Sequence, residues 1–221
     1  MVISINTPRS KSELEMFLSP YSTIPGSRLF KRELEQYQTP TSLAAHAAWI
    51  LYMKKKTASS TILDLGCGTG ILSIATLLVG ARRSICVDID WDLLVVAIEF
   101  VSRNYAGLVY RLIFIMGDVV DMVFTGVDVV LMNPPFGVYR ENRGLDLDFL
   151  QVAVASAGVV YSFHKYSEGL VEIIKSLASK YGFEIAWFEI LDFQIPMIYS
   201  RHKRRIYRVK TLFIGLEKKV L

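Results

Sequence analysis

From residue 60 onward, short apolar runs alternate with longer segments in which apolar residues recur every three or four positions. Short apolar runs that end in Gly, Asp or Asn are typical of buried strands, and the longer periodic segments are typical of helices. Alternating strands and helices predict a doubly wound α/β sheet. We expect strands at 61–65, 84–87, 112–116, 127–132, 159–163, 183–191 and 208–216, and helices at 71–79, 91–104, 146–157 and 168–181.

The first 55 residues have weaker periodicity and predict a helical extension in front of this unit. A short helix is expected at 12–18, where a serine at position 10 or 12 can cap its first turn. Another is expected at 42–52, with Pro40 near its first turn. The chain of 221 residues has no repeats or low-complexity linkers. We therefore expect one domain, 1–221, with an N-terminal helical extension over about 1–55.

Composition narrows the class of protein. Hydrophobic residues make up 52% of the chain, and its mean hydropathy is +0.36. Even so, no run approaches the ~18 apolar residues that a membrane span needs, and the start lacks the layout of a secretion signal. The two cysteines, Cys67 and Cys86, form no CxxC pair and are too few for a zinc site, so we expect no metal and a reducing cytoplasm. The high content of apolar residues favours a surface that binds a partner protein.

The stretch Asn133-Pro134-Pro135-Phe136 directly follows one predicted strand. Two prolines end this strand because neither can donate a hydrogen bond to the sheet. Asn133 therefore lies at the carboxyl end of the strand, where open α/β sheets bind ligands. Its side-chain oxygen and the Pro134 carbonyl can accept both hydrogens of a planar exocyclic amine, and Phe136 offers a face for stacking of a base. The simpler interpretation is a strand that stops at a Pro-Pro turn.

A glycine-rich turn with Gly66, Gly68 and Gly70 follows the first predicted strand. Position 71, which would be the third glycine of a dinucleotide-binding turn, is Ile here, but the glycines still allow a ligand to approach the backbone. Asp88 ends the second strand, where a carboxylate can accept both hydroxyls of a ribose. Asp118 ends the third strand and is suited either to an adenine amine or to capping a helix. The set predicts a pocket for S-adenosylmethionine beside a pocket for a planar amine.

The residue types favour methylation of nitrogen over methylation of carbon. Methyl transfer to C5 of a pyrimidine needs a cysteine nucleophile, but Cys67 lies in the glycine turn and Cys86 within a buried strand. A nitrogen needs only a lone pair held in line with the methyl group. We therefore expect Asn133→Ala to abolish turnover and to leave cofactor binding nearly intact.

The motifs also resemble a known family over about residues 30–215. The residues at 64–70, 88–90 and 133–137 resemble class I methyltransferases with an NPPF motif, and those at 34–39, 160–165 and 202–203 resemble, more specifically, methyltransferase-like protein 5 and its archaeal relatives. The resemblance implies a Rossmann-like class I methyltransferase domain with a seven-stranded, mostly parallel sheet, one antiparallel strand and helices on both faces. It implies methylation of N6 of an adenosine in small-subunit ribosomal RNA.

The resemblance also implies site residues and a partner. Thr69 stands where eukaryotic members carry Cys, so the side-chain details of that contact stay open. The implied partner is a small zinc-binding activator protein shared by several RNA methyltransferases. Residues expected to bind the cofactor are Gln36, Thr39, Asp64, Gly66, Gly68, Thr69, Ile71, Asp88, Asp118 and Val119.

The pattern itself gives a second reason to expect a partner. The predicted helix at 91–101 is apolar on nearly all sides, and such helices are covered on more than one side. The strand at 110–116 would lie at the sheet edge if the family's strand order holds, and an unpaired apolar edge invites another chain. The alternative is thorough packing within the monomer.

The net charge of +4 is modest, but six of the basic residues fall between positions 201 and 210, with Tyr207 among them. Basic residues interleaved with an aromatic ring favour contact with nucleic-acid phosphates. The polar segment 137–144 is expected to become ordered on RNA. The RNA-binding residues that we expect are Arg140, Arg143, Lys203, Arg204 and Arg205, together with His164 and Lys165, whose role is implied mainly by the resemblance.

Rival functions stay open at this stage. The NPPF motif also serves N2 of guanine in ribosomal RNA, and a related motif serves the side-chain amide of glutamine in a release factor. In a different class, the chain could be a non-catalytic RNA-binding assembly factor. A binding protein would not need the glycine turn, Asp88 or Asn133, so their presence argues against this last function.

Overall fold

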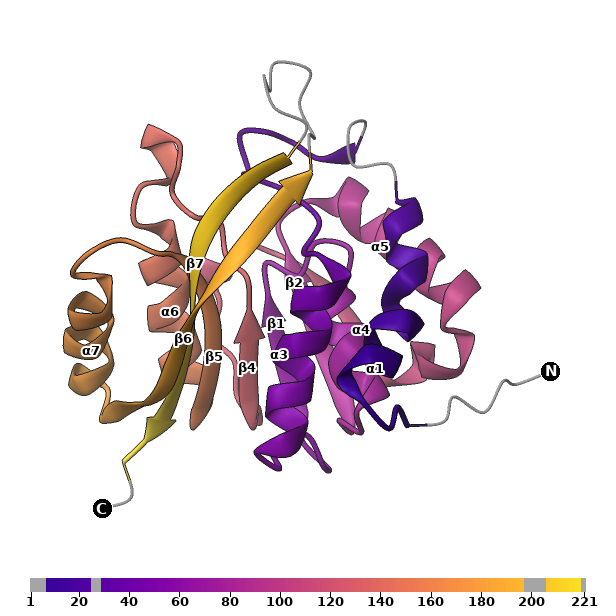
Figure 1. Cartoon of the computed structure of the whole chain (residues 1–221), viewed down its shortest axis with the longest axis horizontal. Coiled ribbons are helices and arrows are strands. Elements are labelled where there is room, and N and C mark those ends of the chain that lie inside the picture. The colour runs from indigo at the N-terminus through magenta and orange to yellow at the C-terminus, as the bar shows by residue number, and fades with distance from the viewer. Residues whose placement is uncertain (1–6, 25–28, 197–205, 220–221) are drawn as a thin grey trace.

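The computed structural model describes residues 7–24, 29–196 and 206–219, and its centre is one seven-stranded sheet (Figure 1). The strand order is β3-β2-β1-β4-β5-β7-β6, and β7 runs in the direction opposite to the other six strands. This confirms the expected Rossmann-like sheet. The strands are β1 (Thr61–Leu65), β2 (Arg83–Asp88), β3 (Leu112–Met116), β4 (Val129–Met132), β5 (Val159–Lys165), β6 (Phe183–Pro196) and β7 (Ile206–Lys218).

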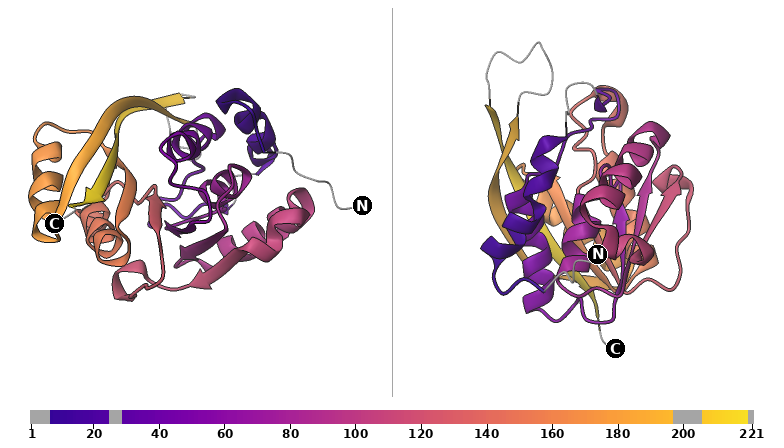
Figure 2. Two further views of the ribbon diagram at one scale, coloured as in Figure 1. Left: turned by 90° about the horizontal axis from the view of Figure 1, so that it is seen from below. Right: turned by 90° about the vertical axis from the view of Figure 1, so that its right-hand side faces the viewer.

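Helices cover both faces of the sheet, which separates two hydrophobic cores (Figure 2). α1 (Lys11–Leu18), α3 (Thr41–Met53), α4 (Ile71–Leu78) and α5 (Trp91–Asn104) pack into one core, and α6 (Leu145–Ser156) and α7 (Leu170–Lys180) pack into the other. Short 3-10 turns are η1 (Ser19–Thr23), η2 (Ala106–Arg111), η3 (Val119–Asp121) and η4 (Arg140–Asn142). Within the described ranges, no helix combines the length and the apolar character of a membrane span.

Local sequence explains where most of these elements begin and end. Ser10 caps α1 as predicted, because its hydroxyl accepts a hydrogen bond of 3.1 Å from the Glu13 amide. Pro40 directly precedes the first residue of α3. The last two strands, however, run further than the sequence pattern predicts. They pair with each other along their whole length, so the pairing extends them past the point where the apolar pattern ends.

The order of the strands reverses beside β1, which lies between β2 and β4. In doubly wound sheets, ligands bind outside the carboxyl ends of the strands at such a point. β3 lies at an edge of the sheet, which confirms the expected strand order. Its side chains Ile113 and Met116 are 42% and 58% exposed.

A disulfide joins Cys67, in the glycine turn, to Cys86 in β2, with Cα atoms 5.4 Å apart. Asp64 is the register partner of Cys86, so the turn that follows β1 passes close to β2. The sequence analysis missed this bond, because a spacing of 19 residues without a CxxC motif carries no signal for pairing. The bond also stands against the reducing environment that the low cysteine count suggested.

Candidate active site

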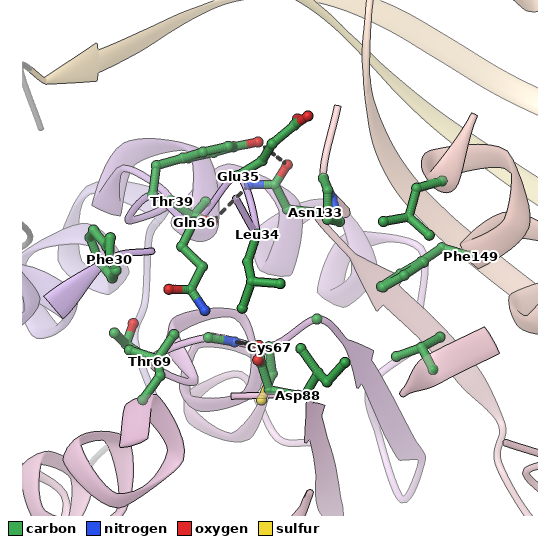
Figure 3. A pocket seen from close by; sticks show the side chains of 18 of the residues that line it. Phe30, Leu34, Glu35, Gln36, Thr39, Cys67, Thr69, Asp88, Asn133 and Phe149 are labelled. Carbon is green, nitrogen blue, oxygen red and sulfur yellow. Dashed lines mark hydrogen bonds between the residues drawn. The ribbon is translucent and has the colours of Figure 1, made fainter. Parts of the chain in front are cut away.

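A cavity of about 270 Å³ opens at the carboxyl ends of β1, β2 and β4. Figure 3 shows Leu34 and Gln36 reaching from the N-terminal segment toward Cys67 and Asp88, with Asn133 in the same pocket. The structure therefore brings the predicted cofactor and amine positions together in one site. Nine of the ten residues expected to bind the cofactor line the cavity: Gln36, Thr39, Gly66, Gly68, Thr69, Ile71, Asp88, Asp118 and Val119.

The Asp88 carboxylate is held in place by backbone amides. The Gly68 amide donates to Oδ2 at 2.8 Å, and the Asp90 amide donates to Oδ1 at 2.9 Å. Gly68 has a φ of +56°, a conformation that glycine adopts without strain and that aims its amide at Asp88. Burial raises the pKa of Asp88 while these amides act to lower it. Each carboxylate oxygen keeps a second lone pair, so Asp88 can still accept hydroxyl groups of a ligand.

Asp118 caps a 3-10 turn and also lines the cavity. Its Oδ1 accepts a hydrogen bond of 3.2 Å from the Val120 amide, which caps η3. Asp118 and the neighbouring Val119 also line the cavity. Capping therefore orients a carboxylate that still faces the pocket.

Asp64 is the one predicted cofactor residue that does not line the cavity. It is completely buried, and its Oδ2 accepts hydrogen bonds from the Ser73 amide at 3.0 Å and the Ser73 hydroxyl at 2.8 Å. Burial raises the pKa of Asp64 to about 7. Its side chain points into the fold because it ties the end of β1 to α4. This corrects the expectation of direct cofactor contact.

The segment 30–39 crosses the part of the cavity lined by Thr69 and Asp88, and its polar side chains fasten it there. Gln36 donates to Asp90 Oδ2 at 2.9 Å, and Thr69 donates to Gln38 Oε1 at 2.8 Å. Lys31 pairs with the buried Asp90 at 2.7 Å. Although burial acts to raise it, the bonds from Lys31 and Gln36 lower the pKa of Asp90.

Asn133 lies at the tip of β4 and lines the cavity together with Pro135, while Pro134 is buried. The Asn133 Nδ2 donates to Thr39 Oγ1 at 2.9 Å, and the Asn133 Oδ1 accepts from the Tyr37 hydroxyl at 3.3 Å. An amide oxygen has two lone pairs, so Oδ1 can accept one more hydrogen bond. The sequence analysis did not identify Tyr37 as a contact of Asn133, because the two are far apart in the chain.

Phe136 was expected to stack on the target base. Its ring is only 8% exposed and belongs to a hydrophobic core, and it packs at 5.6 Å from the ring of Tyr37. Phe136 is not among the residues that line the cavity. The structure thus gives this ring a packing role, and its stacking on a base stays a prediction.

The expected RNA-binding residues separate into three groups. Arg140, Arg143 and Lys165 are exposed beside the catalytic edge of the sheet. His164 is completely buried, with Nδ1 2.8 Å from Asp146 Oδ2, which corrects the expectation that it contacts RNA. Successive side chains of β5 point to opposite faces, so Lys165 faces solvent where His164 cannot. Residues 203–205, which hold Lys203, Arg204 and Arg205, lie outside the described part of the chain.

The segment after the NPPF motif, expected to become ordered on RNA, is already held by hydrogen bonds within the protein. The Glu35 carboxylate accepts hydrogen bonds from the Tyr139 amide at 2.9 Å and from Asn142 Nδ2 at 3.2 Å. The Arg32 guanidinium lies over the ring of Tyr139. Gly137 has a φ of +67°, and a Cβ there would meet the Asn142 carbonyl at 3.0 Å, so only glycine fits. The segment is therefore anchored to residues 32–35.

A seven-stranded sheet with one reversed strand, a glycine turn facing the acidic end of β2, and an Asn-Pro-Pro motif at the end of β4 define a class I methyltransferase. Residues 45–159, just over half of the chain, match the model of the methyltransferase small domain. The chain belongs to the methyltransferase small domain family, in the group that contains the Mettl5 enzymes and their archaeal relatives.

Several relatives match nearly the whole chain. The rRNA N6-adenosine methyltransferase Mettl5 of Drosophila melanogaster is 33% identical, over 83% of this chain and 86% of its own. An uncharacterized protein of Methanocaldococcus jannaschii is 32% identical, over 94% of each chain. A solved structure from Pyrococcus horikoshii, assigned as an RNA methyltransferase, superimposes with a TM-score of 0.82 at 30% identity, over 95% of this chain and 98% of that one.

Proposed function

We propose that this protein transfers a methyl group from S-adenosylmethionine to N6 of an adenosine in ribosomal RNA, in the small subunit and in the cytoplasm. The observation that carries the proposal is the Asn133 amide, held at the tip of β4 and facing the same cavity as Asp88. The rRNA N6-adenosine methyltransferase of Drosophila, which aligns over most of the chain, supports the choice of substrate. The small-subunit assignment rests on the resemblance described above.

The cavity has the polar groups that S-adenosylmethionine requires. We assign the ribose hydroxyls to Asp88, and the adenine edge to Asp118 with the Val119 amide, because all three residues line the cavity. Glycines 66 and 68 have positive φ values and line the cavity, so a ligand can approach the turn closely. When bound, the cofactor supplies an electrophilic methyl group.

The protein's own contribution is to hold the acceptor nitrogen. Asn133 Oδ1 and the Pro134 carbonyl accept the two hydrogens of the exocyclic amine. These bonds draw the nitrogen lone pair out of conjugation with the ring and point it toward the cofactor half of the cavity. No strong base is needed, because the proton can leave to solvent after transfer.

The test is transfer of labelled methyl groups to total ribosomal RNA, followed by analysis of the nucleosides. N6-methyladenosine is the expected product; N2-methylguanosine, label on a glutamine-containing protein, or no label would point to the rival functions. Asn133→Ala should reduce turnover at least about a thousandfold, since the amine loses its only side-chain acceptor, while cofactor affinity changes less than about twofold. Asn104→Ala, at an exposed asparagine of α5, is the matched control. Full activity of the Asn133→Ala variant would refute the proposal.

We also propose that a small zinc-binding activator protein pairs with the β3 edge. Among the described residues, β3 pairs only with β2, and Ile113 and Met116 on it, together with Tyr110 before it, are exposed. An unpaired apolar edge is the type of surface to which another chain adds a strand. Trp91 and Ile98 of the adjacent α5 are also exposed and would extend the same interface.

A further inference from the structure

Successive side chains of the segment 35–39 contact opposite halves of the cavity: the half near Asp88 and Thr69, called the cofactor half, and the half near Asn133, called the acceptor half. Gln36 and Gln38 bond to the cofactor half, at Asp90 and Thr69. Glu35, Tyr37 and Thr39 bond to the acceptor half, where they reach Asn133 and the segment that follows the NPPF motif. The alternation places every second side chain of this segment on the machinery that receives the substrate.

Tyr37 contacts both ends of the catalytic motif. Its hydroxyl donates to Asn133 Oδ1 at 3.3 Å, and its ring lies 5.6 Å from that of Phe136, inclined by 50°. Phe136 is itself buried, so the ring of Tyr37 rests on a fixed surface. Burial raises the pKa of Tyr37 well above its ordinary value of 10.0, so its hydroxyl keeps the proton that it donates.

Thr39 holds the opposite end of the same amide. Its hydroxyl oxygen accepts from Asn133 Nδ2 at 2.9 Å. The two hydroxyls thus hold both ends of the amide. Because a hydroxyl can donate or accept, rotation of the amide by 180° would require Tyr37 and Thr39 to exchange these roles, and it would turn an NH2 group toward the incoming amine, donor against donor.

We propose that Tyr37 is a positioning residue for methyl transfer: with Thr39, it fixes the Asn133 amide so that its oxygen faces the acceptor amine. The inference rests on the proposed function, in which Asn133 receives that amine. Tyr37 acts through Asn133 and is not itself a catalytic residue. The carbonyl of Pro134 belongs to the backbone and needs no such orientation, whereas a side-chain amide can rotate.

The first test is Tyr37→Phe, which removes one oxygen and keeps the ring against Phe136. We expect kcat to fall about tenfold or more, while KM for RNA, Kd for S-adenosylmethionine and the melting temperature stay near their original values. Tyr52→Phe, at a tyrosine that is 41% exposed at the end of α3, is the matched control and should keep full kcat. An unchanged kcat in Tyr37→Phe would overturn the inference. A loss that follows the melting temperature and cofactor affinity in parallel would overturn it as well.

A second test separates positioning from direct action. In single-turnover reactions, Tyr37→Phe should slow the native enzyme but add little to Asn133→Ala, since the hydroxyl has no amide left to orient. Additive losses would overturn the inference.

Thr39→Ser should retain kcat and Thr39→Val should lose it; equal rates for these two variants would also count against the inference. If Asn133→Ala is fully active, the proposed function fails; if Asn133→Ala is inactive and Tyr37→Phe is normal, only this inference fails.

Discussion

Asp64 shows how a residue in a functional motif can have a structural role. Its carboxylate accepts two hydrogen bonds from Ser73, and the Ser84 hydroxyl donates to Ser73 Oγ at 2.9 Å. This chain of bonds links β1, α4 and β2 beneath the glycine turn. All three side chains are completely buried. Asp64 thus supports the turn from below, and Asp88 contributes to the cavity above it.

The titration of Asp64 gives a prediction about stability. Its pKa is about 7 in the folded protein, against an ordinary value of 3.8, so the unfolded chain loses this proton first as the pH rises. Stability from this group is complete below about pH 4 and falls by about 1.4 kcal/mol per pH unit up to about pH 7. Urea unfolding of Asp64→Asn should lack this slope, and Asp121→Asn, at an exposed position, should keep it. Parallel profiles for the native protein and Asp64→Asn would contradict the assignment.

The site residues that the strand pattern itself predicts share one property: they stand at the ends of strands. Asp88, Asp118 and Asn133 interrupt an apolar run, and a polar residue in that place marks the ligand-binding edge of a parallel sheet. Tyr37 and the buried His164 could not be assigned in this way, because their partners come from distant elements. Their hydrogen bonds depend on packing that no local pattern encodes.

At the scale of elements, the sheet could be predicted closely, since each strand and helix carries its own periodicity. β1, β3 and α5 have the boundaries that the sequence predicts. The ends of β6 and β7 could not be predicted, because the two strands extend each other by mutual pairing. The edge position of β3 followed from the family's strand order and not from its own residues.

The β3 edge gives a prediction that belongs to this scale. Ile113→Asp places a charge on the exposed face of the edge strand, so it should abolish copurification with a coexpressed small zinc-binding activator of RNA methyltransferases. Ile173→Asp, on α7 and similarly exposed, is the matched control and should copurify normally. Copurification of both variants would exclude β3 as the interface. So would a complete lack of association by the native chain.

At the scale of the whole molecule, the disulfide joins the glycine turn to the neighbouring strand. Gly66, Cys67 and Gly68 of this turn line the cavity, so the bond restrains one wall of the site.

Reduction of this bond should lower the free energy of unfolding by about 3 kcal/mol, because it releases a loop of 19 residues. Cofactor affinity should fall as well, since Cys67 lies between two glycines of the turn. Calorimetry and cofactor titration with and without dithiothreitol measure both effects. The double variant Cys67→Ser, Cys86→Ser should be insensitive to the reductant. Unchanged stability of the native protein after verified reduction would contradict this prediction.

The position of the segment 35–39 in the chain has a consequence for the Asn133 amide. The family model begins at residue 45, whereas Tyr37 and Thr39, which bond to this amide, lie before it. A truncated chain that keeps only residues 45–159 would therefore leave the Asn133 amide without either hydroxyl.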